Sequence, residues 1–150
     1  MLLRTSNHYR LVYASRGAIA HGHGVLEAEL RRILESSRRG NPLVQVTGAL
    51  LFNIDAFAQV LEGHYEAVNT LFEKIAKDKR HRNSVILEAV PVERRAFAHW
   101  SMGYGGRHEN ERVRFASLVG DGGPNDGRAG AGRVLNLLGG AMSRNAPVPV

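Results

Sequence analysis

Two amphipathic helical segments with a pair of strand-like runs between them constrain the fold of this chain most. "VLEAELRRILESS", from Val25, places apolar residues at i, i+4, i+7 and i+8, the spacing of one helix face. "GHYEAVNTLFEKIAKD", from Gly63, has the same kind of spacing. Between them, "LVQVTGALLFN" and "AFAQVLE" read as strands joined by the turn candidate "NIDA". The order predicts a β-hairpin between two helices.

Three further strand-like runs flank this unit. They are "YRLVYAS" (9–15), "SVILEAVPV" (84–92) and "RRAFAHWSMGY" (94–104). The resulting order is the ferredoxin-like β-α-β-β-α-β pattern with an additional fifth strand. We therefore expect an α+β fold in which two helices cover one sheet face. Such a fold permits a ligand between the helices but assigns no function by itself.

The chain changes character near Gly105. "GDGGPNDGRAGAG" (120–132) has the composition of a flexible linker, and short helices are expected on either side of it. We predict one domain over 8–105 and a C-terminal extension over 106–150. That extension is expected either to lie on the sheet or to bind a partner.

Composition narrows the class of protein. The 150 residues include no cysteine, which excludes disulfides, thiolate nucleophiles and cysteine-based metal sites. No apolar run reaches the roughly 18–20 residues of a membrane span, and no signal-peptide core is visible. We expect a cytoplasmic protein without membrane association. The net charge of +6 could indicate nucleic-acid binding, but aromatic residues are few and no recognition motif appears.

Catalytic and metal-binding patterns are weak. His21 and His23 in "HGHG" lack a third ligand at a typical spacing, so no metal is expected. "GRAGAG" lacks the lysine and preceding strand of a phosphate loop. No nucleophile triad or acid–base carboxylate pair stands out, and Glu62, at a strand end, is expected to be exposed.

A glutamine on an apolar strand face is the most informative polar residue. In "AFAQVLEG", Phe57, Gln59 and Leu61 share one face. A buried amide needs partners. Tyr13 and Trp100 lie on segments that can neighbour this strand, and a polar planar ligand would satisfy such a cluster.

The segment "DKRH", from Asp78 to His81, closes the second helix. Its cations complement the helix dipole, which is sufficient reason for their presence. Alternatively, Arg80 recognises an acidic or carbonyl-rich ligand.

Six stretches together resemble one known family. They are "RLVYAS", "ILESSRRGNP", "VTGALLF", "AFAQVLEG", "DKRH" and "FAHWSM", in this order between about Tyr9 and Gly103. The set is similar to the BLUF domain, a blue-light sensor that uses FAD. The resemblance implies non-covalent FAD with its ring between the two helices above the sheet.

The resemblance also implies roles for individual residues. Tyr13 corresponds to the photoactive tyrosine and Gln59 to the switching glutamine, with Trp100 and Met102 as signal relay. Many members have Asn or His where this chain has Gly40. The flavin-binding positions implied by the resemblance are Asn41, Gln59, Lys74, Asp78, Arg80 and His81.

The implied function is that of a short stand-alone photoreceptor rather than an enzyme. Excitation of FAD would cause electron and proton transfer from the tyrosine and a switch of the glutamine's hydrogen bonds. The red-shifted signalling state would then pass to an unidentified downstream signalling protein, and a homo-oligomer is expected. The alternatives are a flavin-dependent oxidoreductase or acylphosphatase-like enzyme on a similar fold, and a basic nucleic-acid-binding module.

Overall fold

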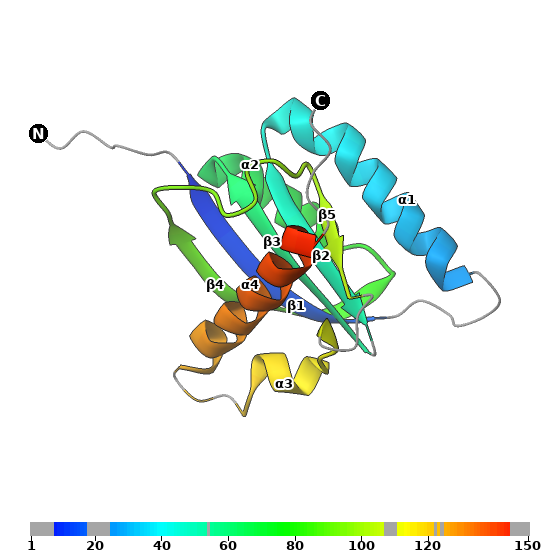
Figure 1. Ribbon diagram of the computed structural model, residues 1–150, viewed down its shortest axis with the longest axis vertical. Helices are drawn as coiled ribbons and strands as arrows, with labels where there is room; N and C mark the ends of the chain where they lie inside the picture. Colours follow the sequence, from blue (N-terminus) through cyan, green and yellow to red (C-terminus); the bar gives the residue numbers. More distant parts are fainter. Residues whose placement is uncertain are drawn as a thin grey trace, which may run out of the picture.

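The computed structural model describes most of the chain. The described residues are 8–17, 25–53, 55–106, 111–121, 123 and 125–144. They contain a five-stranded sheet with the strand order β4-β1-β3-β2-β5 (Figure 1). The strands are β1 (Tyr9–Gly17), β2 (Thr47–Asn53), β3 (Ala56–Gly63), β4 (His81–Pro91) and β5 (Gly103–Gly105). Strands β1 to β4 pair antiparallel, and β5 pairs parallel to β2. The ferredoxin-like prediction with a fifth strand is confirmed.

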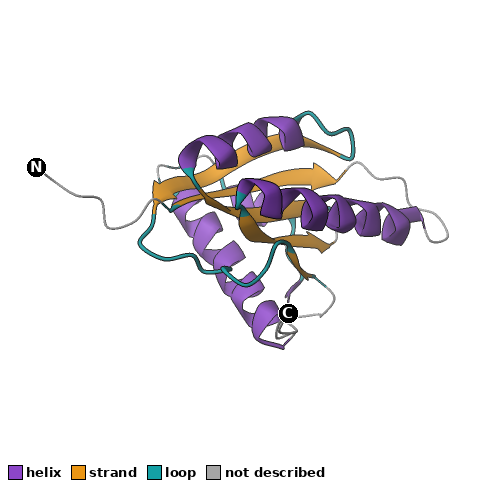
Figure 2. Cartoon of the chain, turned by 90° about the horizontal axis from the view of Figure 1, so that it is seen from above, coloured by secondary structure: helices purple, strands orange, loops and turns teal. Residues whose placement is uncertain are grey.

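Two helices cover one sheet face, as the sequence predicts. They are α1 (Val25–Gly40), continued by the short 3-10 helix η1 (Asn41–Val44), and α2 (Tyr65–Ala76). Figure 2 shows helices on both sides of the sheet. Alternating strand residues divide the core into two clusters, since successive side chains point to opposite faces. Tyr13 and Leu50 lie in the α1/α2 cluster, whereas Val12 and Leu51 lie in the other.

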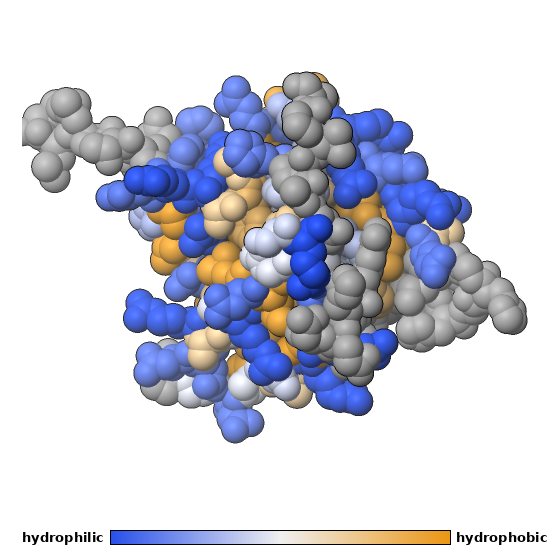
Figure 3. Space-filling view, viewed as in Figure 1, coloured by the Kyte–Doolittle hydropathy of each residue, from blue (hydrophilic) through white to orange (hydrophobic). Residues whose placement is uncertain are grey.

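The C-terminal region forms the second cover of the sheet. After the short helix α3 (Phe115–Val119), α4 (Asp126–Arg144) buries Val134 and Leu138 in the opposite cluster. The region therefore lies on the sheet, the first of the two arrangements expected. In the view from this side, hydrophobic residues gather near the centre and hydrophilic residues surround them (Figure 3).

The linker prediction for 120–132 is wrong from Asp126 onward, because that part begins a 19-residue helix. Two of its glycines, Gly127 and Gly130, allow close helix packing. A Cβ at Gly130 would lie 2.0 Å from the carbonyl oxygen of Leu118, and one at Gly127 would lie 2.6 Å from that of Leu87. Backbone proximity therefore accounts for these two glycines, whereas a Cβ at Gly132 would meet nothing within 4 Å.

The predicted fifth strand over 94–104 is also wrong in extent. Only Gly103–Gly105 forms a strand, and the preceding residues run irregularly. The backbone N–H groups of Ala96 and Phe97 donate to the carboxylate of Glu62, at 2.9 and 2.8 Å, instead of to a neighbouring strand. Trp100 and Met102 both precede β5, so neither lies in a strand.

Glu62 is buried, which contradicts the expectation that it is exposed. Its side chain lies on the α4 side of the sheet and accepts a further bond from Arg10 Nε at 2.9 Å. A buried carboxylate needs such partners because desolvation otherwise disfavours its charge. Glu62 is a structural anchor between β3, β1 and the segment that leads to β5.

Within the described part of the chain, no helix has both the length and the apolarity to span a membrane. Over the same residues, no group of three or more histidines and acids could hold a metal ion. His21 and His23 lie outside the described residues.

Gly40 provides a stability prediction, since it ends α1 with helical dihedral angles, φ −84° and ψ −40°. A Cβ there would meet nothing within 4 Å. Gly40→Ala should raise the free energy of unfolding by roughly 0.4–1 kcal/mol, because it restricts the unfolded chain without strain. Urea unfolding measures this. Gly48→Ala is the opposing control, since its Cβ would lie 1.9 Å from the Val60 oxygen. A destabilised Gly40→Ala variant would contradict the argument.

Candidate functional site

A cavity of about 610 Å³ lies between α1 and α2 above the sheet. This volume falls within the range of small-molecule sites, roughly 300–1,000 Å³. Apolar side chains such as Ile33, Leu50 and Leu71 form part of its walls. The polar lining residues are Tyr13, Ser36, Ser37, Asn41, Gln59, Glu66, Thr70, Lys74, Asp78, Arg80 and His81.

The floor of the cavity contains the partners of the buried amide. Tyr13 and Gln59 face each other in the β1–β3 register, and the Tyr13 hydroxyl donates to Gln59 Oε1 at 2.6 Å. Gln59 Nε2 donates to Met102 Sδ at 3.3 Å. All three side chains are buried. Because a thioether is a weak acceptor, a better acceptor in the cavity could compete for the amide hydrogens.

Tyr13 is held in its neutral form. Burial raises the pKa of its phenol, and the negative charge of Asp78 raises it further. The Phe72 ring lies beside it, with centroids 5.2 Å apart. The hydroxyl is therefore a hydrogen-bond donor at neutral pH and a proton source only when another event makes it acidic.

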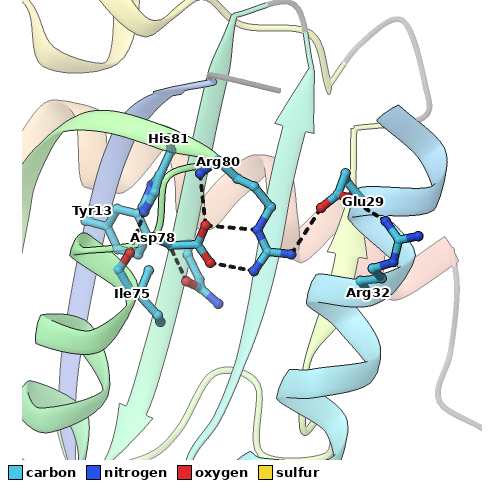
Figure 4. A network of polar contacts seen from close by, with 8 residues as sticks. Tyr13, Glu29, Arg32, Ile75, Asp78, Arg80 and His81 are labelled. Carbon is cyan, nitrogen blue, oxygen red and sulfur yellow. Dashed lines mark hydrogen bonds and ion pairs between the residues drawn. The ribbon is translucent and has the colours of Figure 1, made fainter. Parts of the chain in front are cut away.

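An ion-pair network joins α1 to the turn between α2 and β4 at one side of the cavity (Figure 4). Asp78 accepts from Arg80 Nε at 2.9 Å and from Arg80 Nη2 at 2.5 Å. These bonds lower the pKa of Asp78, so the carboxyl stays ionised, and they raise the pKa of Arg80. Arg80 Nη1 also lies 3.5 Å from Glu29 of α1, which pairs with Arg32.

His81 is fixed by a bond on each side of its ring. Nε2 donates to the Ile75 carbonyl at 2.6 Å, because a carbonyl can only accept, and Nδ1 lies 2.6 Å from Ser15 Oγ. The ring lies near Tyr13 and Phe57, with centroids 6.0 and 5.8 Å away. These contacts hold a polar ring at the cavity wall.

The structure brings together nearly all the residues predicted for the site. Met102 accepts a hydrogen bond from Gln59 at the cavity floor. Trp100 packs instead against the hydrophobic cluster on the α4 side of the sheet. Sequence reasoning missed Ser15, although it shares a strand face with Tyr13, and it missed Ser36 and Ser37. The predicted residues that line the cavity are Tyr13, Asn41, Gln59, Lys74, Asp78, Arg80 and His81.

A ferredoxin-like sheet with this cavity defines a small-molecule-binding domain. The model of the BLUF family, described as sensors of blue-light using FAD, matches residues 8–103. The chain belongs to the BLUF family, a family of flavin-binding blue-light sensors.

Two curated relatives match less than half of the chain. Photoactivated adenylate cyclase subunit beta of Euglena longa is 35% identical over 75 residues, 49% of this chain and 9% of that protein. The blue light- and temperature-regulated antirepressor BluF of Escherichia coli (strain K12) is 39% identical over 59 residues, 39% of this chain and 15% of that protein. The chain therefore spans only a small part of the length of these relatives.

Solved structures match over more of the chain. The photo-activated state of BlsA has a TM-score of 0.66 and 32% identity, covering 85% of this chain and 94% of that one. The dark state of BlrB, a BLUF protein, has a TM-score of 0.68 at 24% identity, covering 92% of this chain and 99% of that one. The BlrB likeness supports the fold alone.

Proposed function

We propose that this chain holds FAD non-covalently in the α1/α2 cavity and that Tyr13 and Gln59 form its light-driven switch. The observation that carries the proposal is the buried Tyr13–Gln59–Met102 chain at the cavity floor. The cavity combines apolar walls with convergent polar groups, as a planar heterocycle with polar edges requires. A bound flavin supplies absorption of blue light and, when excited, an acceptor for an electron and a proton.

The residues around the cavity would bind and orient the ring. Asn41, Lys74 and Arg80 provide hydrogen-bond donors along the walls, and Asp78 provides an ionised acceptor. Ile33 and Leu50 offer apolar contact that excludes water. The open space beside Gly40 is where many family members carry a larger side chain, so this wall makes fewer contacts.

Gln59 is suited to act as the switch because its amide has a donor end and an acceptor end of similar shape. In the structure, the acceptor end faces Tyr13 Oη and the donor end faces Met102 Sδ. Rotation of the amide would exchange the positions of its oxygen and nitrogen. Tautomerisation would move a proton from the nitrogen to the oxygen, so that the oxygen becomes the donor. Either change has little steric cost. The hydrogen bonds to the cavity and to Met102 would then change together.

Met102 offers a route from the switch to the C-terminal region. It immediately precedes β5, and a Cβ at Gly103 would lie 2.2 Å from Met142 Sδ of α4. A shift of Met102 would therefore reach α4 through close packing. We propose that this response is read by a downstream signalling protein in the cytoplasm, and that the chain forms a homo-oligomer.

An absorption spectrum before and after blue illumination tests this function. Protein expressed with FAD available should be yellow, shift reversibly to longer wavelength and recover in darkness. Extraction of the bound cofactor identifies the flavin. A colourless protein contradicts the proposal, and a yellow protein without a reversible shift favours a redox enzyme instead.

Tyr13→Phe should suppress the reversible red shift while flavin is retained. The change removes only the hydroxyl that donates to Gln59 at 2.6 Å and leaves the packing against Phe72 in place. Time-resolved absorption measures the effect. Tyr104→Phe, which removes a hydroxyl 3.4 Å from the Phe52 carbonyl, is the matched control. A normal photocycle in Tyr13→Phe would exclude Tyr13 as the required donor.

A further inference from the structure

Three consecutive backbone carbonyls hold the irregular segment before β5 in place. Each accepts a hydrogen bond from a different element of the fold. The pairs are Gly48 N to Trp100 O at 2.9 Å, Asn41 Nδ2 to Ser101 O at 2.8 Å, and Arg38 Nε to Met102 O at 3.0 Å. Because the segment has no strand ladder there, these bonds, together with those of Ala96 and Phe97 to Glu62, hold its position.

The bond from Arg38 acts on the residue that contacts the proposed switch. Met102 Sδ accepts from Gln59 Nε2 at 3.3 Å, and Met102 is 1% exposed. A methionine side chain has three rotatable bonds and adapts readily to its surroundings. A charge-assisted bond to its carbonyl fixes the backbone from which this side chain extends. The positions that the sulfur can reach are restricted as a result. Arg38 is not among the described residues that line the cavity.

We propose that Arg38 is a positioning residue for the photoswitch and acts through Met102. It holds Met102 Sδ against the Gln59 amide and so sets the relative stability of the amide's two orientations. The inference rests on the proposed function, because it assigns a role within that switch. It also places one control of the switch on the last turn of α1, outside the flavin cavity.

Arg38→Ala and Arg39→Ala form a matched pair, since both remove an exposed cation from the last turn of α1, whereas the bond to the Met102 carbonyl comes from Arg38. Both flavin-loaded proteins are illuminated, and the rate of dark recovery is measured with flavin content per chain. Arg38→Ala should change this rate about fivefold or more, as expected for loss of one charge-assisted bond, whereas Arg39→Ala should stay within about twofold. Should Arg38→Ala not fold, Arg38→Met, which keeps most of the side-chain stem but has no N–H donor and no charge, is read in the same way.

A double-mutant cycle shows whether Arg38 acts through Met102. In a Met102→Leu background the sulfur is gone, so adding Arg38→Ala should change recovery by less than about twofold. A wild-type recovery rate in Arg38→Ala, or an undiminished effect in the Met102→Leu background, overturns the inference. If the wild-type protein binds no flavin or shows no light-induced shift, that result contradicts the proposed function rather than the role of Arg38.

Discussion

Gln59→Leu is expected to keep the flavin and to lose the reversible red shift completely. Leucine fills most of the space of the buried amide but offers neither an acceptor to Tyr13 nor a donor to Met102. The other polar groups of the cavity remain, so binding should persist. Loss of the amide removes the only part of the proposed switch that can exchange donor and acceptor ends.

The measurement is a difference spectrum after blue illumination, with the flavin content determined on the same sample. Asn136→Leu, which replaces an exposed amide on α4, is the matched control and should retain the full shift. A Gln59→Leu protein that photocycles like the wild type would show that another group carries the switch.

Glu62→Ala is expected to lower the free energy of unfolding by about 3–5 kcal/mol, the usual cost of breaking a buried ion pair from one side. The Glu62 side chain is fully buried and accepts bonds from Arg10, Ala96 and Phe97. Its removal leaves a partly buried guanidinium and two backbone N–H groups without their acceptor.

Urea unfolding tests this prediction against Glu93→Ala, an exposed glutamate whose loss should change stability by no more than about 0.5 kcal/mol. If Glu62→Ala does not fold, Glu62→Gln is the second variant. It retains one acceptor oxygen and should lose less stability. Equal effects of Glu62→Ala and Glu93→Ala would be inconsistent with an anchoring role for Glu62.

Strand periodicity predicted the central polar residue of the site, and the resemblance to the BLUF family implied most of the other positions. Alternation along β3 places Gln59 on the face of Phe57 and Leu61, and the α1/α2 cluster confirms this. Asp78 and Arg80 were identified at the end of a helix, and both line the cavity. The resemblance to the BLUF family supplied the common ligand that periodicity alone could not name.

The errors share a physical cause, which is that a long-range partner overrides a local pattern. Residues 94–102 have strand composition, but a carboxylate on β3 takes the N–H groups of Ala96 and Phe97. The glycine-rich run after Asp126 has linker composition, but its small residues let α4 approach Leu118.

By itself, the sequence determined the order of helices and strands and which strand residues share a face, because helical and strand periodicities are local. Only the tertiary structure decided that Glu62 is an anchor, that Trp100 faces α4, and that Arg38 holds the Met102 carbonyl. The hydrogen bonds of Glu62 and Arg38 join residues between 34 and 64 positions apart. Spacing along the chain carries no information about them until the sheet is assembled.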